Sequence, residues 1–287
     1  MQKSALHLFQ KQHFIINQFN ATMKFPKLLY LLIACSLFVF SSCTEDDDTG
    51  PNTGNKTCLP VKVTDEDQVT SITYSNGKIA SFSNDEFGSV NVQYHTSGNK
   101  ADKPAKMPFG TDGSFEYMYD NQGKLTGTMI TTPEFQGAGL LAEFEYSGNR
   151  ISKVTRYLAF PGEDEDDPQL FPFGYTTYQY DSKGNVTLVK EFGDQDSTTP
   201  DNTTEYTYDS KPTPTAAFMA LFIGLPGMTP PAANNILTEV HKEGNTVDKD
   251  LSYTNTYVFN ENGYPTKTTR TSQNGEVSVI NIDYNCQ

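Results

Sequence analysis

The chain has 287 residues, with 35 acidic side chains against 21 basic ones and a formal net charge of −14. Phosphate binding rests on clustered lysine and arginine, and no such cluster occurs, so we expect no nucleic-acid partner. The sequence also lacks the glycine-rich phosphate loops and the Gly-x-Ser-x-Gly nucleophile motif, so we expect no catalytic residues and no cofactor.

The N-terminal region has the composition of an export signal. The apolar run 28–40 is thirteen residues long, whereas a transmembrane helix needs about 20. A short basic stretch, 23–27, precedes the run, as in signal peptides. We therefore interpret 1–42 as a signal peptide, with Met23 as the true start because 1–22 fit poorly as its extension.

A cysteine ends this signal. Ser41-Ser42-Cys43 resembles the lipobox of bacterial lipoproteins, whose cysteine is diacylated, so Cys43 is the expected lipid attachment site and links the chain to a membrane. Cys35 is a rival that would leave an apolar tail after cleavage. A plain secretory signal with an incidental cysteine is the other alternative.

The stretch 43–57 is an expected acidic, flexible tether. Its run Glu45-Asp46-Asp47-Asp48 resembles the export signal of Bacteroidetes surface lipoproteins. The resemblance implies an outer-membrane protein that faces the cell exterior. The alternative is a solvated acidic linker.

The remaining region, 58–287, has the length of one large all-β domain. With the leader removed, four lysines and no acid are lost, so the net charge falls from −14 to −18. Cys58 and Cys286 bracket the region in an oxidising compartment, and we predict a disulfide between them. Two free thiols are the alternative. The pairing requires the first and last strands to lie side by side.

Seven segments of this region repeat one design, in which aromatic residues alternate along a strand that ends in a tight turn. The segments are 72–79, 92–100, 115–126, 144–151, 178–187, 206–211 and 257–266. Alternation places the aromatic residues on one face of each strand. Turns such as Asp120–Gly123, Asp181–Gly184 and Asn260–Gly263 suit a type I turn closed by a glycine bulge, whereas Asn76-Gly77 and Gly148-Asn149 suit two-residue loops. The pattern predicts consecutive antiparallel hairpins in a curled sheet, a barrel or half-barrel.

The repeat resembles the YD repeats of Rhs-type proteins in a diverged form. Together with the lipobox, the acidic run and the Asn-Gly-Tyr-Pro-Thr-Lys ending at 262–267, it resembles a group of uncharacterised Bacteroidetes lipoproteins with a porin-like fold. The resemblance covers about 58–287 and implies a curled antiparallel sheet. It implies no working porin, because the strands lack the regular outward apolar band of a membrane barrel.

One segment, 212–235, interrupts the repeat. Phe218, Leu221, Phe222 and Leu225 follow helical spacing between prolines and glycines, which predicts a short helical insertion near 215–225. We interpret it as a core plug of the curled sheet. An apolar lid, a docking surface and membrane contact remain alternatives.

Candidate sites are few. His95 and His241 lack metal-ligand spacing, and we expect surface or turn histidines and no metal site. The acidic loop 163–167 and the pair Asp194 and Asp196 are interpreted as solvated, with a calcium site as the alternative. The fifteen tyrosines that follow the leader belong to the repeat and are interpreted as structural, although tyrosines also stack on sugars.

These observations predict a non-enzymatic, surface-exposed lipoprotein with a binding or structural role. Its partner is an unidentified glycan, envelope protein or host protein. The alternative is a glycan-acting enzyme or a glycan-binding accessory protein of the outer membrane, which would require two carboxylates across a concave face.

Overall fold

The structure is a computed structural model that describes residues 57–287 except 67, 86–87, 133–137 and 162–167. The described residues all belong to one of the two compact units into which the chain divides. Their elements are β1 (Cys58–Asp65), β2 (Gln68–Ser75), β3 (Lys78–Asn84), β4 (Gly88–Asn91), β5 (Gln93–Tyr94), the 3₁₀ helix η1 (Gly98–Lys100), β6 (Pro104–Phe109), β7 (Gly113–Tyr119), β8 (Leu125–Thr131), β9 (Gly139–Ser147), β10 (Arg150–Phe160), β11 (Gln169–Tyr180), β12 (Val186–Phe192), β13 (Asn202–Pro212), α3 (Ala216–Ala220), β14 (Asn234–Glu243), β15 (Thr246–Phe259), β16 (Pro265–Ser272) and β17 (Val277–Cys286).

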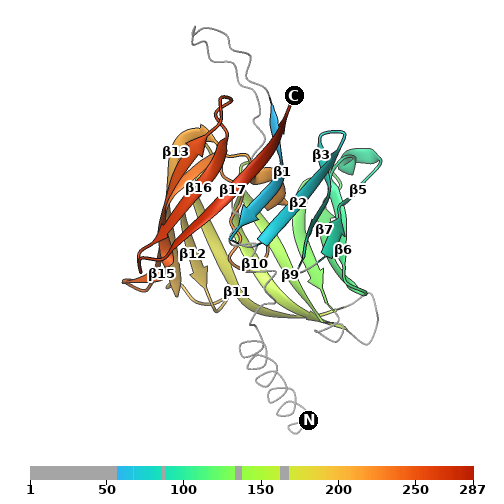
Figure 1. The fold of residues 1–287 in the computed structure, drawn as a ribbon. Coiled ribbons are helices and arrows are strands. Elements are labelled where there is room, and N and C mark those ends of the chain that lie inside the picture. The colour runs from blue at the N-terminus through green and yellow to red at the C-terminus, as the bar shows by residue number, and fades with distance from the viewer. Residues whose placement is uncertain (1–56, 67, 86–87, 133–137, 162–167) are drawn as a thin grey trace, which may run out of the picture. The chain divides into compact units, whose positions relative to one another are not determined.

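The strands form one antiparallel sheet that curls until its ends meet (Figure 1). Each strand pairs with its neighbour in sequence, and β1 pairs with β17 from Cys58↔Cys286 to Asp65↔Ile280. Strands β4 and β5 are separated by Val92 alone, and Val92 still donates its N–H to Ala80. If β4 and β5 are counted as one interrupted strand, the sheet has 16 strands instead of 17. An even number is what a closed ring of antiparallel strands requires. The expected curled sheet is therefore a barrel.

The two faces of the wall differ in polarity. Alternate residues such as Ile72, Phe115 and Val154 point inward and are almost fully buried. The outward positions carry Thr, Lys and Glu, including the ion pair of Lys106 with Glu116 at 2.6 Å. Further outward ion pairs join Lys153 to Glu145, Lys242 to Glu205 and Lys62 to Asp283. Most apolar side chains of the wall thus face the interior, although Leu251, Val258 and Val277 are exposed at 52%, 58% and 60%.

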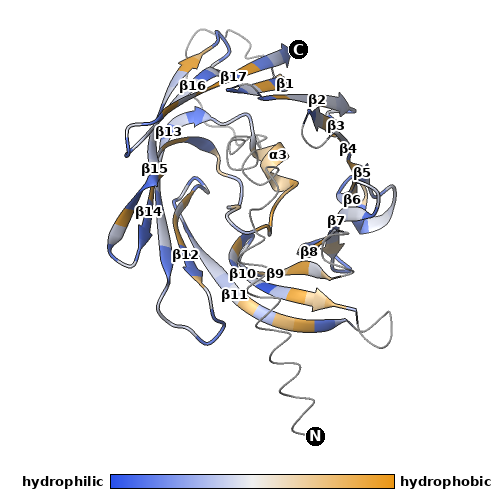
Figure 2. Cartoon of the chain, turned by 60° about the horizontal axis from the view of Figure 1, so that its bottom comes forward, coloured by the Kyte–Doolittle hydropathy of each residue, from blue (hydrophilic) through white to orange (hydrophobic). Residues whose placement is uncertain are grey.

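The connection between β13 and β14 enters the barrel, where α3 lies inside the ring of strands (Figure 2). The expected helical insertion is confirmed, but the helix covers only Ala216–Ala220. It ends early because Gly224 has a φ of +97° and Pro226 follows two residues later, which is incompatible with a longer helix. The apolar residues 221–223, 225 and 228 are nevertheless buried. No helix in the described part of the chain is long and apolar enough to span a bilayer.

The turns follow their predicted chemistry. Gly123, Gly184 and Gly263 have positive φ angles of 79°, 98° and 82°, and in each turn the glycine N–H bonds the carbonyl of the Asp or Asn three residues earlier. At Asn76-Gly77 both residues have positive φ, as a two-residue type I′ loop requires. These turns lie at one rim of the barrel, which we call the repeat rim. The rim also holds Cys58 and Cys286.

Candidate functional site

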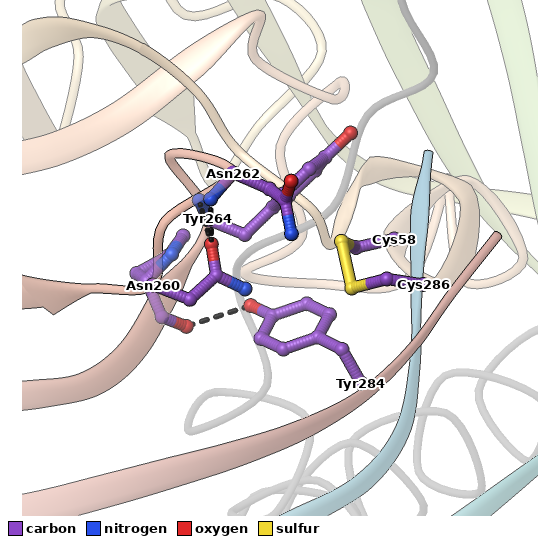
Figure 3. The surroundings of a disulfide bond; sticks show 7 residues. Cys58, Asn260, Asn262, Tyr264, Tyr284 and Cys286 are labelled. Carbon is purple, nitrogen blue, oxygen red and sulfur yellow. Dashed lines mark hydrogen bonds between the residues drawn. A yellow bond between two sulfur atoms is a disulfide. The ribbon is translucent and has the colours of Figure 1, made fainter. Parts of the chain in front are cut away.

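The sequence predicts two sites on cysteines, the lipid attachment at Cys43 and the disulfide of Cys58 with Cys286, and the structure describes only the second. Cys43 and the tether lie outside the described residues. Cys58 and Cys286, the pair expected from the sequence, are joined by a disulfide with their Cα atoms 4.0 Å apart. Figure 3 shows the disulfide beside Tyr284 and the turn from Asn260 to Tyr264. The bond therefore lies on the β1–β17 pairing that closes the barrel.

The tyrosines of the repeat form a belt on the inner side of the repeat rim. Each belt tyrosine donates its hydroxyl to a main-chain carbonyl of the preceding neighbouring strand, at 2.5 to 2.9 Å. The pairs are Tyr94 with Ile79, Tyr119 with Pro104, Tyr146 with Leu125, Tyr180 with Ile151, Tyr208 with Val186, Tyr257 with Ile236 and Tyr284 with Pro265. These links run from β3 to β17, and the disulfide lies in the part of the rim that they leave out.

A β-bulge explains why these carbonyls are available. In each hairpin, the residue after the acceptor is left out of the strand register. The skipped residues are Ala80, Ala105, Thr126, Ser152, Thr187, Leu237 and Thr266 on β3, β6, β8, β10, β12, β14 and β16. A bulge disrupts the ladder locally, and a buried carbonyl needs a donor. The tyrosine of the next hairpin supplies that donor.

Basic residues that follow the turn glycine or asparagine complete the repeat. Lys124 lies 3.8 Å from the centre of the Tyr146 ring, and Arg150 lies 5.4 Å from that of Tyr180. Burial raises the pKa of every belt tyrosine. The tyrosines thus hold the barrel together, as the structural interpretation predicts, and their hydroxyls are not offered to an external sugar.

A second set of wall residues binds the inserted segment, which we call the plug and define as residues 213–233. Tyr117 donates to the carbonyl of Leu221 at 2.6 Å, and Thr128 donates to that of Ile223 at 3.1 Å. Arg156 is only 6% exposed. It reaches the carbonyl of Gly224 at 3.2 Å through Nε and that of residue 225 at 3.4 Å through Nη2. The plug is therefore held by its backbone as well as by its apolar side chains.

The inner wall also contains a cluster of ionisable groups, on β14 to β16. Both oxygens of Glu239 are occupied, because Tyr253 donates to one and His241 Nε2 lies 2.6 Å from the other. The second ring nitrogen of His241 lies 3.0 Å from the hydroxyl of Thr204. His241 lies in β14 and not in a turn, and its side chain is 27% exposed, so the expected surface or turn histidine is a strand residue that is partly buried. It shares the inner face with the buried Thr204, its partner in the strand register.

Arg270 completes this cluster. Its guanidinium lies 3.9 Å from the centre of the Tyr253 ring. Burial alone would lower the pKa of Arg270, but the opposite charges of Tyr253 and Glu239 outweigh burial and raise it. Burial raises the pKa of the nearby Asp65 despite the opposing effect of Arg270. Within the described part of the chain, Nε and Nη2 of Arg270 are buried without a hydrogen-bond partner, so the guanidinium is linked to Glu239 and Asp65 through its charge.

The sequence could not have revealed this cluster, because its members lie far apart along the chain. They are Asp65, Glu239, His241, Tyr253 and Arg270. His95 follows β5, as a turn histidine should, and packs edge-on against Tyr119. Among the described residues, no three His, Cys, Asp or Glu side chains gather as metal ligands. The acidic loop 163–167 lies outside the described residues.

No protein-family model and no curated protein sequence matches the chain. Solved structures do match, and two of them are porin-like proteins. A porin-like protein from Bacteroides uniformis ATCC 8492 aligns over 79% of this chain and 96% of its own, with 13% identity and a TM-score of 0.50. A porin-like protein from Bacteroides vulgatus ATCC 8482 aligns over 79% and 99%, with 14% identity and the same TM-score. Nearly the whole of each neighbour is thus matched, and the chain has a porin-like fold.

Proposed function

We propose that this chain is a non-enzymatic, lipid-anchored protein of the outer envelope, displayed at the cell surface. Its filled barrel would be a scaffold for binding rather than a conduit. The observation that carries this proposal is the polarity of the wall. The interior is predominantly apolar around the plug, with the ionisable cluster on β14 to β16 set into it, while the outward positions bear ion pairs such as Lys106 with Glu116.

A barrel that crosses a membrane needs the opposite arrangement, with an outward apolar band that faces lipid. The outward Lys, Glu and Thr side chains therefore favour a domain that stands in water and reaches the membrane through an attached lipid. The porin-like fold of the structural neighbours supports the architecture alone. The lipobox at Cys43 and the acidic run behind it support the anchor and the outward address.

Metabolic labelling with an alkyne fatty acid tests the anchor. The wild-type protein and the Cys35→Ala variant should incorporate label, whereas Cys43→Ala should not. Labelling that survives Cys43→Ala would refute the anchor. Protease treatment of intact cells tests the address. The domain should be cleaved in the wild type and protected when the acids of 45–48 are replaced by alanine.

Two measurements on the purified domain test the scaffold role. Planar bilayers exposed to the domain should show no stepwise conductance, because the lumen is filled. A glycan array should reveal the ligand if that ligand is a sugar. If no sugar binds, the partner must be an envelope or host protein.

The cluster around Glu239 favours the second candidate, a glycan-acting enzyme, because it places a carboxylate beside a histidine. Both oxygens of Glu239 are already bonded, which argues for a structural role. Incubation with a library of glycans should therefore release no reducing sugar. Release by the wild type and its loss in Glu239→Gln would replace the binding proposal with the enzymatic one.

A further inference from the structure

The plug interrupts a hairpin that otherwise follows the repeat. In the hairpin of β11 and β12, the sequence Tyr-Asp-Ser-Lys-Gly-Asn occupies 180–185 without interruption. In that of β13 and β14, Tyr-Asp-Ser-Lys occupies 208–211, and the matching asparagine is Asn235. The stretch 212–234 stands where the other hairpin has one glycine.

Side-chain geometry confirms that the two asparagines are equivalent. Asp181 accepts hydrogen bonds from the N–H and the side-chain amide of Asn185, at 2.9 and 2.8 Å. Asp209 accepts the same two bonds from Asn235, at 3.1 and 2.9 Å, although 26 positions separate them instead of four.

The strand register agrees. Tyr180 pairs with Val186, the residue after Asn185. In the same way Tyr208 pairs with Ile236, the residue after Asn235. The belt also continues across the insertion, because Tyr257 donates to the carbonyl of Ile236. The hairpin therefore keeps the geometry of a repeat hairpin on both sides of the insertion, and the pair Pro212↔Asn234 extends it by one step.

The wall binds the plug in the manner in which a protein binds a peptide. The wall donors Tyr117, Thr128 and Arg156 all address main-chain carbonyls. The side chains of the plug enter apolar surroundings, as where Phe218 and Phe222 meet Phe82 edge-on at 5.1 and 5.6 Å. Such contacts select an apolar peptide with a bend rather than a particular polar sequence.

The bend is the most specific contact. A Cβ on Gly224 would lie 2.4 Å from the hydroxyl of Thr128 and 2.9 Å from the Cβ of Ala142. A Cβ on Gly227, which also has a positive φ, would meet nothing within 4 Å. Both glycines have a positive φ, +97° at Gly224 and +75° at Gly227, so both substitutions strain the backbone, and the contact with the wall is made at Gly224 alone.

We infer that the inner wall of the barrel is a binding site for an apolar peptide, and that the insertion 212–234 occupies this site in cis. The ligand class is a short apolar segment with a glycine at its bend. This inference does not depend on the lipid anchor or on the surface address.

The test replaces 212–234 by a single glycine, which restores the Tyr-Asp-Ser-Lys-Gly-Asn turn. A fluorescent synthetic peptide of sequence 212–234 should bind this variant saturably and raise its Tm, whereas wild type should not bind it. A peptide with Gly224→Ala should bind about tenfold more weakly or worse than one with Gly227→Ala, since overpacking costs about 1–3 kcal/mol and 1.4 kcal/mol is a tenfold change. Equal affinity of the two peptides, or no binding to a folded variant, would overturn the inference.

A second experiment covers the case in which the shortened variant does not fold. Protease sites are inserted after Lys211, which is exposed, and after Ala232, which is partly exposed, and are cleaved in the folded protein to release residues 212–232. The excised plug should remain bound on gel filtration and exchange with the labelled peptide while the circular dichroism of the barrel persists. Loss of the plug together with loss of the β signal would show a permanent part of the core and sink the proposal.

Discussion

The belt makes the fold depend on single hydroxyl groups, and Tyr180→Phe removes one of them with little change in volume. The Tyr180 hydroxyl donates to the carbonyl of Ile151 at 2.6 Å, at a point where the bulge at Ser152 interrupts the ladder. The ring stays in place, so neither a cavity nor a clash is created. What changes is that one partly buried carbonyl loses its donor.

The expected cost combines two effects. A net hydrogen bond contributes about 1 kcal/mol, and a buried acceptor left without a partner costs about 1–3 kcal/mol. Because Tyr180 is only partly buried, water can compensate in part, and we expect a loss of about 1–2 kcal/mol. For a domain of this size 1 kcal/mol shifts Tm by about 2–4 °C, so Tm should fall by about 2–8 °C.

Urea and thermal unfolding of the purified domain, followed by circular dichroism, measure this loss. The matched control is Tyr264→Phe, because the hydroxyl of Tyr264 has no hydrogen-bond partner among the described residues. Tyr208→Phe, which removes a bond of 2.6 Å to Val186, should cost as much as Tyr180→Phe. If Tyr180→Phe and Tyr208→Phe are as stable as the Tyr264 control, the belt does not stabilise the barrel.

Three further predictions concern closure, ionisation and the plug. Replacing Cys58 and Cys286 by serine should lower the free energy of unfolding by about 3–5 kcal/mol, since the bond closes a loop of more than 200 residues. Equal urea midpoints for the wild type with and without reductant would contradict this. Mass spectrometry of the intact domain should find the two cysteines in one linked peptide. The belt tyrosines have pKa values raised above the usual 10, so their contribution to stability is fully present below pH 10 and is lost as the pH rises further. Tyrosinate absorbance should therefore increase together with unfolding. Ionisation of all tyrosines in a barrel that stays folded would refute the burial argument. Arg156→Lys keeps the charge but replaces three separate donor nitrogens, which bond Gly224, Thr176 and residue 225, by one, so stability should fall by about 1–3 kcal/mol. A surface substitution such as Lys106→Arg is the neutral control in the same urea titration.

Patterns that span only a few residues were enough to predict much of the fold. Tyrosine alternation and Asp-x-x-Gly turns predict hairpins because both depend on residues a few positions apart. The position of Cys58 and Cys286 at the two ends of the domain predicted the closing disulfide. The spacing of Phe218 and Leu221 predicted a buried helical piece.

Long-range features were out of reach. The acceptor of each belt tyrosine is a main-chain carbonyl, which leaves no trace in residue identity. The contact of His241 with Glu239 and that of Arg270 with the Tyr253 ring depend on which strand faces are inward after closure. The equivalence of Asn235 and Asn185 was hidden by the insertion, although the repeated Tyr-Asp-Ser-Lys before each was visible.

The pairing of β1 with β17 has a consequence for how partners can associate. Open sheets expose a row of unpaired N–H and C=O groups on which another chain can add a strand. In this barrel the pairing of β1 with β17 removes the two open edges that the sheet would otherwise have, and an edge that remains is as short as β4, which pairs with β3 alone, so we expect strand addition to be disfavoured. We expect a partner to recognise outward side chains or the turns at the rims instead. Closure of the sheet thus limits binding through the main chain, which is insensitive to sequence, and favours binding through side chains, which depends on the partner.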